Sequence, residues 1–198
     1  MSCDYSDFLE MRSNLEEMQS SVDEIIEACA KEISARLLRA VIMRTPVGDY
    51  RVDVEKVAKR NSKNHKKGDK YTVKEKGDKQ GGTLRRGWIS KTEKEAENGN
   101  ETNVNVDKIS AYVSSIPINK IGENYTVEII NPVSYASYVE YGHRQTVGRY
   151  VPAIGKKLKK GFVRGNNMLQ ISENEIRNST PAILEKKINS MLKEYLNG

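Results

Sequence analysis

Few side chains in this sequence are of the kinds that carry out chemistry, and they are widely spaced. The chain of 198 residues has two histidines, His65 and His143, and two cysteines, Cys3 and Cys29. Glu140 stands three residues before His143, so the end of a helix could bring the two together as an acid–base pair. The simpler interpretation is that Glu140 caps a helix, pairs with a nearby arginine or faces a neighbouring subunit.

Other patterns of catalysis or cofactor binding are absent from the sequence. Neither histidine stands at metal-ligand spacing from cysteines or acids, and the acids that a magnesium-dependent nuclease would cluster are dispersed along helices. No glycine-rich phosphate loop follows a strand pattern, and no nucleophile elbow occurs. We therefore predict that the chain is not an enzyme, with no catalytic residue, no cofactor site and no metal site.

The same scan argues against a secreted or membrane protein. No stretch approaches the roughly 20 apolar residues that a membrane span needs, and the acidic first residues do not resemble a signal peptide. Cys29 falls on an apolar helical stripe, which predicts a buried free thiol in a reducing compartment.

Two strongly basic segments are the most distinctive feature of the composition. Residues 51–79 hold 11 lysines and arginines against five acids, and residues 143–165 hold seven against none. The chain carries a net charge of +6, so the remainder is acidic. Such segments suit an acidic partner or nucleic acid, although two solvated loops would look the same. The candidate contact residues are Lys66, Lys67, Lys70, His143, Arg144, Arg149, Lys156 and Lys157.

A long helix is the clearest structural element. Between residues 7 and 44 apolar side chains recur at steps of three or four, and Thr45-Pro46 ends the pattern. Unbroken, this helix would be roughly 55 Å long, which a chain of this size cannot cover by itself. We expect either that it breaks or that its N-terminal half packs on a neighbour.

The rest of the chain predicts a single domain, 1–198, of the α+β class. Residues 49–81 form a basic insertion, either a protruding hairpin or a mobile loop. Residues 83–130 are predicted to form a small, mostly antiparallel sheet, with Trp88 buried and residues 125–130 as its best strand. Residues 134–198 supply two short helices, a basic loop and a C-terminal helix that starts with Thr180 as its cap and Pro181 at its first position.

Three strings of residues resemble the head–tail joining, or tail-completion, family of tailed bacteriophages. Thr45-Pro46-Val47-Gly48 and Gly82-Thr83-Leu84-Arg85-Arg86-Gly87-Trp88 look like one family motif split by the basic insertion. Asn131-Pro132-Val133-Ser134-Tyr135-Ala136-Ser137-Tyr138-Val139-Glu140-Tyr141-Gly142 resembles the family's Tyr-Ala-x-Tyr-Val-Glu-aromatic-Gly string. Gly161-Phe162-Val163-Arg164-Gly165 with Met168-Leu169 is the third. The family's aromatic-Pro-Phe-Leu segment is replaced here by Arg149-Tyr150-Val151-Pro152-Ala153.

This resemblance implies a structural virion subunit of the phage neck, without catalysis. Such a tail-terminator protein would form a ring, of six copies by analogy, that caps the tail tube and joins it to the head. An acidic helix and basic loops on one subunit could pair head-to-tail around such a ring. Its partners would be the tail tube protein and the head-side connector, after assembly in the bacterial host cytoplasm. The alternatives are a head-closure or adaptor protein that makes non-specific contacts with channel DNA, and a basic DNA-binding accessory protein.

Overall fold

The computed structural model describes residues 5–75, 77, 81–99, 104–152 and 155–197. Helices in these residues are α1 (Ser6–Ser20), α2 (Val22–Arg44), α3 (Thr83–Gly87), α4 (Glu93–Asn98), α5 (Val106–Ser115), α6 (Ala136–Tyr141) and α7 (Met168–Asn197). Strands are β1 (Val52–Val57), β2 (Lys70–Glu75), β3 (Asn119–Ile121), β4 (Asn124–Thr126), β5 (Gly142–Arg144), β6 (Tyr150–Val151), β7 (Lys156–Lys157) and β8 (Phe162–Arg164). Together they confirm the α+β class.

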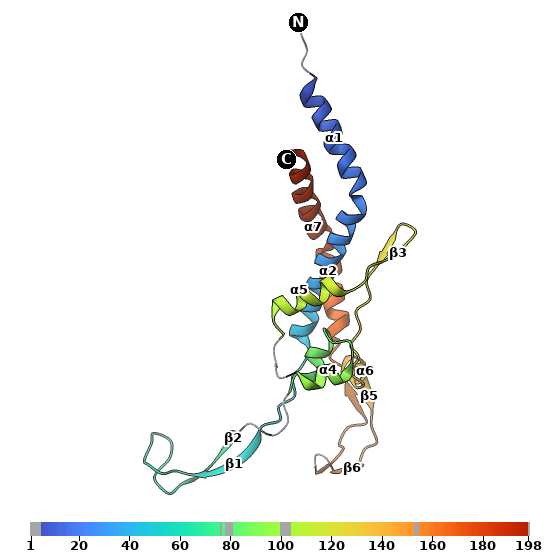
Figure 1. Cartoon of the computed structure of the whole chain (residues 1–198). Coiled ribbons are helices and arrows are strands. Elements are labelled where there is room, and N and C mark those ends of the chain that lie inside the picture. The colour runs from blue at the N-terminus through green and yellow to red at the C-terminus, as the bar shows by residue number, and fades with distance from the viewer. Residues whose placement is uncertain (1–4, 76, 78–80, 100–103, 153–154, 198) are drawn as a thin grey trace.

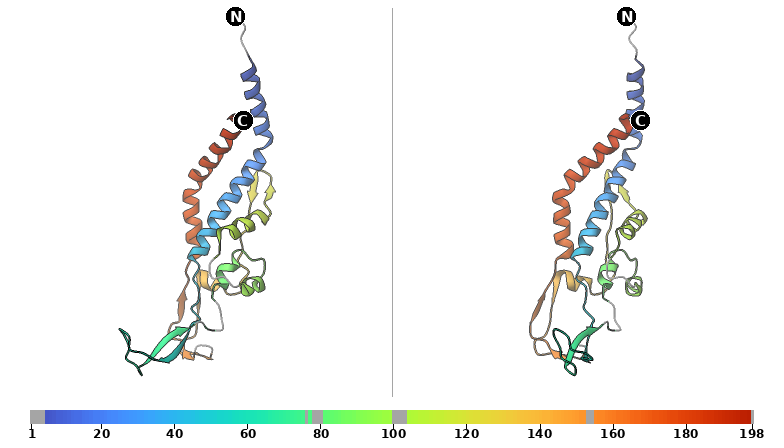
Figure 2. Two further views of the ribbon diagram at one scale, coloured as in Figure 1. Left: turned by 60° about the vertical axis from the view of Figure 1, so that its left-hand side comes forward. Right: turned by 90° about the vertical axis from the view of Figure 1, so that its left-hand side faces the viewer.

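The subunit is elongated, with a helical stem at one end and two protrusions at the other (Figures 1 and 2). The stem consists of α1, α2 and α7, and α1 extends beyond the end of α7. The protrusion built on β1 and β2, residues 49–75, is called the first arm. The protrusion built on β5–β8 and β6–β7, residues 142–152 and 155–165, is called the second arm. Between stem and arms lies a small body that contains α3 to α6.

The strands pair only in twos among the described residues. The antiparallel pairs are β1–β2, β3–β4, β5–β8 and β6–β7, and no pair joins another. The prediction of antiparallel strands is confirmed, but these pairs do not form one sheet against which the helices pack. The hydrophobic core is therefore made mainly by helices.

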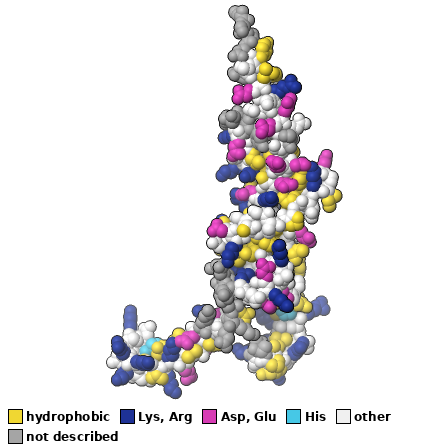
Figure 3. All heavy atoms as spheres, viewed as in Figure 1, with side chains coloured by type: hydrophobic (Ala, Val, Ile, Leu, Met, Phe, Trp, Pro, Cys, Tyr) yellow, Lys and Arg dark blue, Asp and Glu magenta, His cyan; other side chains and the backbone are white. Residues whose placement is uncertain are grey.

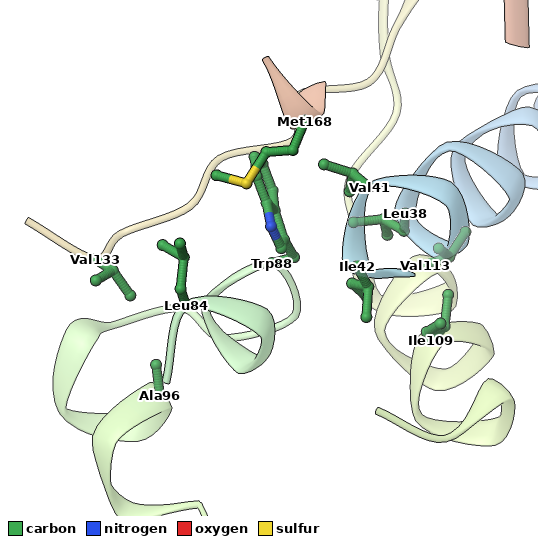
Figure 4. Close-up of a cluster of buried hydrophobic side chains, with 10 residues drawn as sticks. All are labelled: Leu38, Val41, Ile42, Leu84, Trp88, Ala96, Ile109, Val113, Val133 and Met168. Carbon is green, nitrogen blue, oxygen red and sulfur yellow. The ribbon is translucent and has the colours of Figure 1, made fainter. Parts of the chain in front are cut away.

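The core lies at the end of α2 that is nearest the arms (Figure 4). Its buried side chains come from α2, from the body and from the first turn of α7: Leu38, Val41, Ile42, Leu84, Trp88, Ala96, Ile109, Val113, Val133 and Met168. Trp88 is only 4% exposed, which confirms the predicted burial. No residue of α1 belongs to this cluster, so the far end of the stem receives no support from the core.

The long N-terminal helix is confirmed with one interruption. Ser21 separates α1 from α2 and offers no side-chain cap to α2, although backbone hydrogen bonds continue on both sides of it. Thr45 ends α2 in an extended conformation, as expected for the residue before Pro46. Cys29 lies buried on α2 as a free thiol, as predicted.

Residues 83–130 were predicted to form a sheet, and for most of this segment the prediction was wrong. Residues 83–87, 93–98 and 106–115 are helical, and only β3 and β4 are strands. The spacing explains the error, because Leu84 and Trp88 are four residues apart, as are Ile109 and Val113. In each case this period places both side chains on one face of a helix, pointing into the core. Of the predicted strand at 125–130, only Tyr125 and Thr126 lie in β4.

The predicted helix start at Thr180 was also wrong, because α7 runs unbroken through Pro181. Thr180 Oγ1 donates to the Ile176 carbonyl at 2.8 Å, and Ser179 Oγ donates to the Glu175 carbonyl at 3.1 Å. These hydroxyls bond to carbonyls one turn back, beside the Arg177 carbonyl that Pro181, which has no N–H, leaves without its helical donor. Figure 2 shows that α7 changes direction along its length, which is the usual effect of an internal proline.

Candidate assembly interface

The two halves of the split motif meet in the core around Thr45. This threonine is fully buried at the end of α2. Trp88 Nε1 donates to its hydroxyl oxygen at 2.8 Å, and Arg85 Nε donates to its carbonyl at 2.7 Å. The motif residues on either side of the first arm therefore serve a single structural junction.

The first arm leaves the body and returns to it at one point. A Cβ atom added to Gly81 would lie 2.3 Å from the carbonyl oxygen of Gly48 and 2.8 Å from Val47 Cγ1, so the two backbones are in direct contact there. Between these glycines the β1–β2 hairpin projects away from the body (Figure 1). Of the two predicted forms of the basic insertion, the structure shows the hairpin.

The second motif connects the body to α7 through hydrogen bonds that Glu140 accepts. Glu140 is 6% exposed, and its carboxylate accepts hydrogen bonds from the backbone N–H groups of Leu169 and Gln170 at 3.0 and 3.1 Å. These are among the first donors of α7, which lack partners within the helix, so Glu140 caps α7 from another helix. Gly142 ends α6 at φ +81°, as its predicted capping role requires.

Glu140 and His143 do not form a catalytic pair within the described residues. The Glu140 carboxylate is occupied by the N-terminus of α7. The His143 ring packs edge-on against Tyr138, with ring centroids 5.6 Å apart, and its buried Nδ1 atom has no hydrogen-bond partner in the described part of the chain. A structural role for Glu140 as a cap, one of the alternatives left open by the sequence, is confirmed.

Two charged residues that the sequence reasoning missed also hold the body together. Arg86 is 7% exposed, and its guanidinium donates to the carbonyls of Ala96 and Gly81 at 2.7 and 3.2 Å. Asp23 on α2 accepts hydrogen bonds from Lys120 and Tyr125 of the β3–β4 hairpin. The Lys120 and Tyr125 contacts hold the pKa of Asp23 below its ordinary value. Arg86 stands in the motif at 82–88, but its charge gave no sign that it would be buried. No local pattern marks Asp23, because Lys120 and Tyr125 are 97 and 102 residues away.

The predicted contact residues lie in two groups at one end of the molecule. Lys66, Lys67 and Lys70 belong to the tip of the first arm, and the other five belong to the second arm. His143 is half-buried, whereas the lysines and arginines are exposed. Within the described chain none of these cationic side chains forms an ion pair. The structure therefore presents two unneutralised basic surfaces at the arm end of the molecule, on separate protrusions (Figure 3).

The opposite end of the molecule is acidic and apolar. Residues 7–35 contain eight acids and two bases, and acidic side chains are visible along the upper stem in Figure 3. Phe8, Leu9 and Met11 are 66%, 60% and 52% exposed, and Leu15 and Val22 are also exposed. Apolar side chains on a helix without a covering layer mark a surface that a partner can bury.

The described residues contain no group of three or more histidine, cysteine or acidic side chains placed to hold a metal ion. Among them, no helix has both the length and the apolar character needed to cross a membrane.

Comparison with known proteins points to a class of virion proteins. Residues 94–142 match the model of the HK97-gp10-like family, described as "Bacteriophage HK97-gp10, putative tail-component". The matched segment runs from α4 to the end of α6 and includes the second motif with Glu140 and Gly142. Over this segment the match confirms the resemblance to a phage head–tail family. No curated protein and no solved structure matches the chain.

Proposed function

We propose that this chain is a structural subunit of the phage neck, a tail-completion or tail-terminator protein. Copies form a ring, of six by analogy with the family, that caps the tail tube and joins it to the head. The family match supports a tail component, and the exposed stem supports assembly. The subunit acts through shape and contact in the virion, after assembly in the host cytoplasm.

The single observation that carries the proposal is the uncovered apolar row on the N-terminal part of the stem. Phe8, Leu9, Met11, Leu15 and Val22 are each more than two-fifths exposed. Burying a side chain of this kind contributes about 1.5–3 kcal/mol, so leaving five of them in water is costly for an isolated subunit. In a ring, each subunit can bury this row against a different surface of its neighbour. Such heterologous contacts, repeated by rotation about one axis, form a closed ring.

The arm end supports the joining role. Two basic surfaces on separate protrusions suit acidic faces on the tail tube protein or on the head-side connector. A polarised subunit, acidic at the stem and basic at the arms, gives a ring whose two faces differ. A ring of that kind can distinguish a tail below it from a head above it.

The experiment is particle assembly in infected cells that lack the chain. We expect filled heads and separate tails that fail to join, with joining restored when purified protein is added to the mixture. Electron microscopy of the purified protein bound to tails should show a closed ring at the tail end. Complete particles formed without the chain would contradict the proposal, as would protein that stays monomeric on tails.

A second candidate, contact with channel DNA by a head-closure or adaptor protein, rests on the unpaired cations of the second arm. Lysines and arginines can bind phosphates without reading bases. DNA binding of this kind would weaken steeply with salt, and the slope would fall when Lys156 and Lys157 are replaced. Binding that is absent at low salt would exclude this candidate and the accessory DNA-binding protein together. Neither role would cut DNA, with or without magnesium.

A further inference from the structure

A groove opens between α2 and α7 on the side of the core away from the arms. The two helices pack together near the core, and farther along the stem α7, which contains Pro181, changes direction, leaves α2 and approaches α1 (Figure 2). A hollow of about 390 Å³ lies between them, and its lining includes Glu32 and Arg36 of α2 and Ala182, Ile183, Lys186, Lys187 and Ser190 of α7. The change of direction in α7 thus leaves an open hollow between α2 and α7.

The groove is suited to a helix with acidic character. Its floor is small or apolar, with Ala182, Ile183 and Ser190, and small side chains let a second helix approach closely. Lys186 and Lys187 line it, and neither forms an ion pair within the described chain. Arg36 is already paired with Glu32, so the two lysines leave the groove with excess positive charge.

The same sequence contains a helix with the complementary properties. Helix α1 carries one arginine against the acids Asp7, Glu10, Glu16 and Glu17. Its apolar side chains Phe8 and Met11 are more than half exposed. In its own subunit α1 contacts α7 and then extends past the end of that helix, and it contributes no residue to the lining of the groove (Figure 1).

We propose that this groove receives α1 from a second copy of the chain. The inference rests on the proposed ring and identifies the contact that closes it. Both surfaces lie in the stem half of the molecule, and rotation about a ring axis keeps every residue at its own height. Met11 and Arg36 are about 37 Å apart along the stem at about 1.5 Å per residue, so α1 of one copy meets α2 and α7 of the next only if the stems are inclined strongly toward the plane of the ring. The apolar row of α1 is then buried, and its acids face Lys186 and Lys187.

Cross-linking between two distinguishable chains tests the contact directly. One chain carries Met11→Cys and the other, of different mass, carries Ala182→Cys, both with Cys3→Ser. Cys29 can remain, because burial raises the pKa of its thiol and keeps it protonated. Mild oxidation of rings assembled on tails should give a disulfide-linked pair of unequal chains. A matched pair of Met11→Cys and Glu123→Cys, with Glu123 exposed between β3 and β4, should not link.

Charge reversal provides a second readout. Lys186→Glu with Lys187→Glu should weaken association between copies about tenfold at low salt, and less at high salt. Adding Glu10→Lys with Glu16→Lys should restore at least part of the loss. The control pair Lys91→Glu and Lys94→Glu makes the same change of charge on the body and should alter association less than twofold.

The outcomes separate this inference from the proposed function. Rings that still form with no Met11–Ala182 link, and with full affinity after reversal of Lys186 and Lys187, would overturn the groove contact and leave the neck role standing. Failure of the unmodified chain to form rings or to join heads to tails would overturn the neck role itself. A link that forms equally well with Glu123→Cys would also count against the groove, because it would reflect random collisions.

Discussion

Thr45, Trp88 and Glu140 show how residues of the phage-like motifs act in this chain. Each bonds to a segment that is distant in sequence: Trp88 and Arg85 to Thr45 at the end of α2, and Glu140 to the start of α7. Asn131 acts similarly, since its Nδ2 donates to the Leu84 carbonyl at 2.9 Å. The motif residues thus form the hydrogen bonds that hold distant segments of the body together.

Truncation of Trp88 should lower the free energy of unfolding more than truncation of any other core residue. Trp88→Ala empties a core site and should lower the free energy of unfolding by about 3–5 kcal/mol. Trp88→Phe keeps much of the volume but leaves Thr45 Oγ1 without its donor, and should cost about 1–2 kcal/mol. Urea unfolding measures both. Trp88 is the only tryptophan, so a native emission spectrum typical of an indole in water would show that the burial is wrong.

Glu140 should behave as a helix cap. Glu140→Ala removes the acceptor for the N–H groups of Leu169 and Gln170 and should destabilise the fold by about 0.5–2 kcal/mol. Glu140→Gln keeps one acceptor oxygen and should destabilise the fold by a smaller amount than Glu140→Ala. Calorimetry of the variants measures the loss, and the exposed Glu173→Ala on the same helix is the matched control. Equal stability of all three variants would show that the cap contributes nothing.

At the scale of elements, the helices of the stem were predictable and the body was not. The apolar period over residues 7–44 and the Thr45-Pro46 stop predicted the helix and its end correctly. Short segments such as 83–90 contain too few apolar side chains to distinguish a strand from a helix, and burial of Leu84 and Trp88 decides the outcome. At Pro181 the local signal for a helix start was overridden, because packing along α2 supports one continuous helix.

The first arm should be dispensable for folding, because its ends meet at Gly48 and Gly81 and it adds nothing to the core. Replacing residues 51–79 with a short Gly-Ser bridge should shift the melting temperature by less than about 2 °C. Joining of heads to tails should nevertheless fall, because the basic tip is lost. A fall in melting temperature of ten degrees or more would place the arm in the core.

The β3–β4 hairpin should detach from the stem in acid. Lys120, and then Tyr125, lower the pKa of Asp23, so the ionised carboxylate is the form that binds them. A lowered pKa means that the contact is intact at neutral pH, begins to weaken below about pH 4 and is lost as pH falls through the lowered pKa. Amide exchange at residues 119–126 should accelerate over that range. Asp23→Asn should show fast exchange already at pH 7, whereas Glu123→Gln should not.

For the whole molecule, the sequence predicted the two basic segments but not their placement. Lys66 and Arg149 are more than 80 residues apart, yet the fold brings both arms to the end opposite α1 (Figure 1). That placement depends on contacts between segments far apart in the chain, which no local pattern encodes. The groove beside Lys186 was missed for the same reason, because it exists only when α2 and α7 lie together.

Removal of the residues before Val22 tests the assembly role at this scale. The truncated chain keeps every core side chain, so its free energy of unfolding should change by no more than about 1 kcal/mol. It loses most of the exposed apolar row, with each side chain contributing about 1.5–3 kcal/mol when buried, so assembly should weaken at least 100-fold. Light scattering and urea unfolding on the same samples separate the two effects. Truncated protein that still completes particles would refute the role of α1.

Met168 makes completion of the core depend on a residue that is synthesised after all the other core residues. It is 1% exposed in the core, at the first turn of α7, and α7 then packs along α2, more than 120 residues earlier in the chain. While the ribosome is still making residues 1–167, the core lacks this side chain and α2 lacks its companion helix. The groove for a second copy does not yet exist either. In the proposed ring, recruitment of a neighbour through this groove would therefore wait until α7 has been made, which would keep unfinished chains out of the ring.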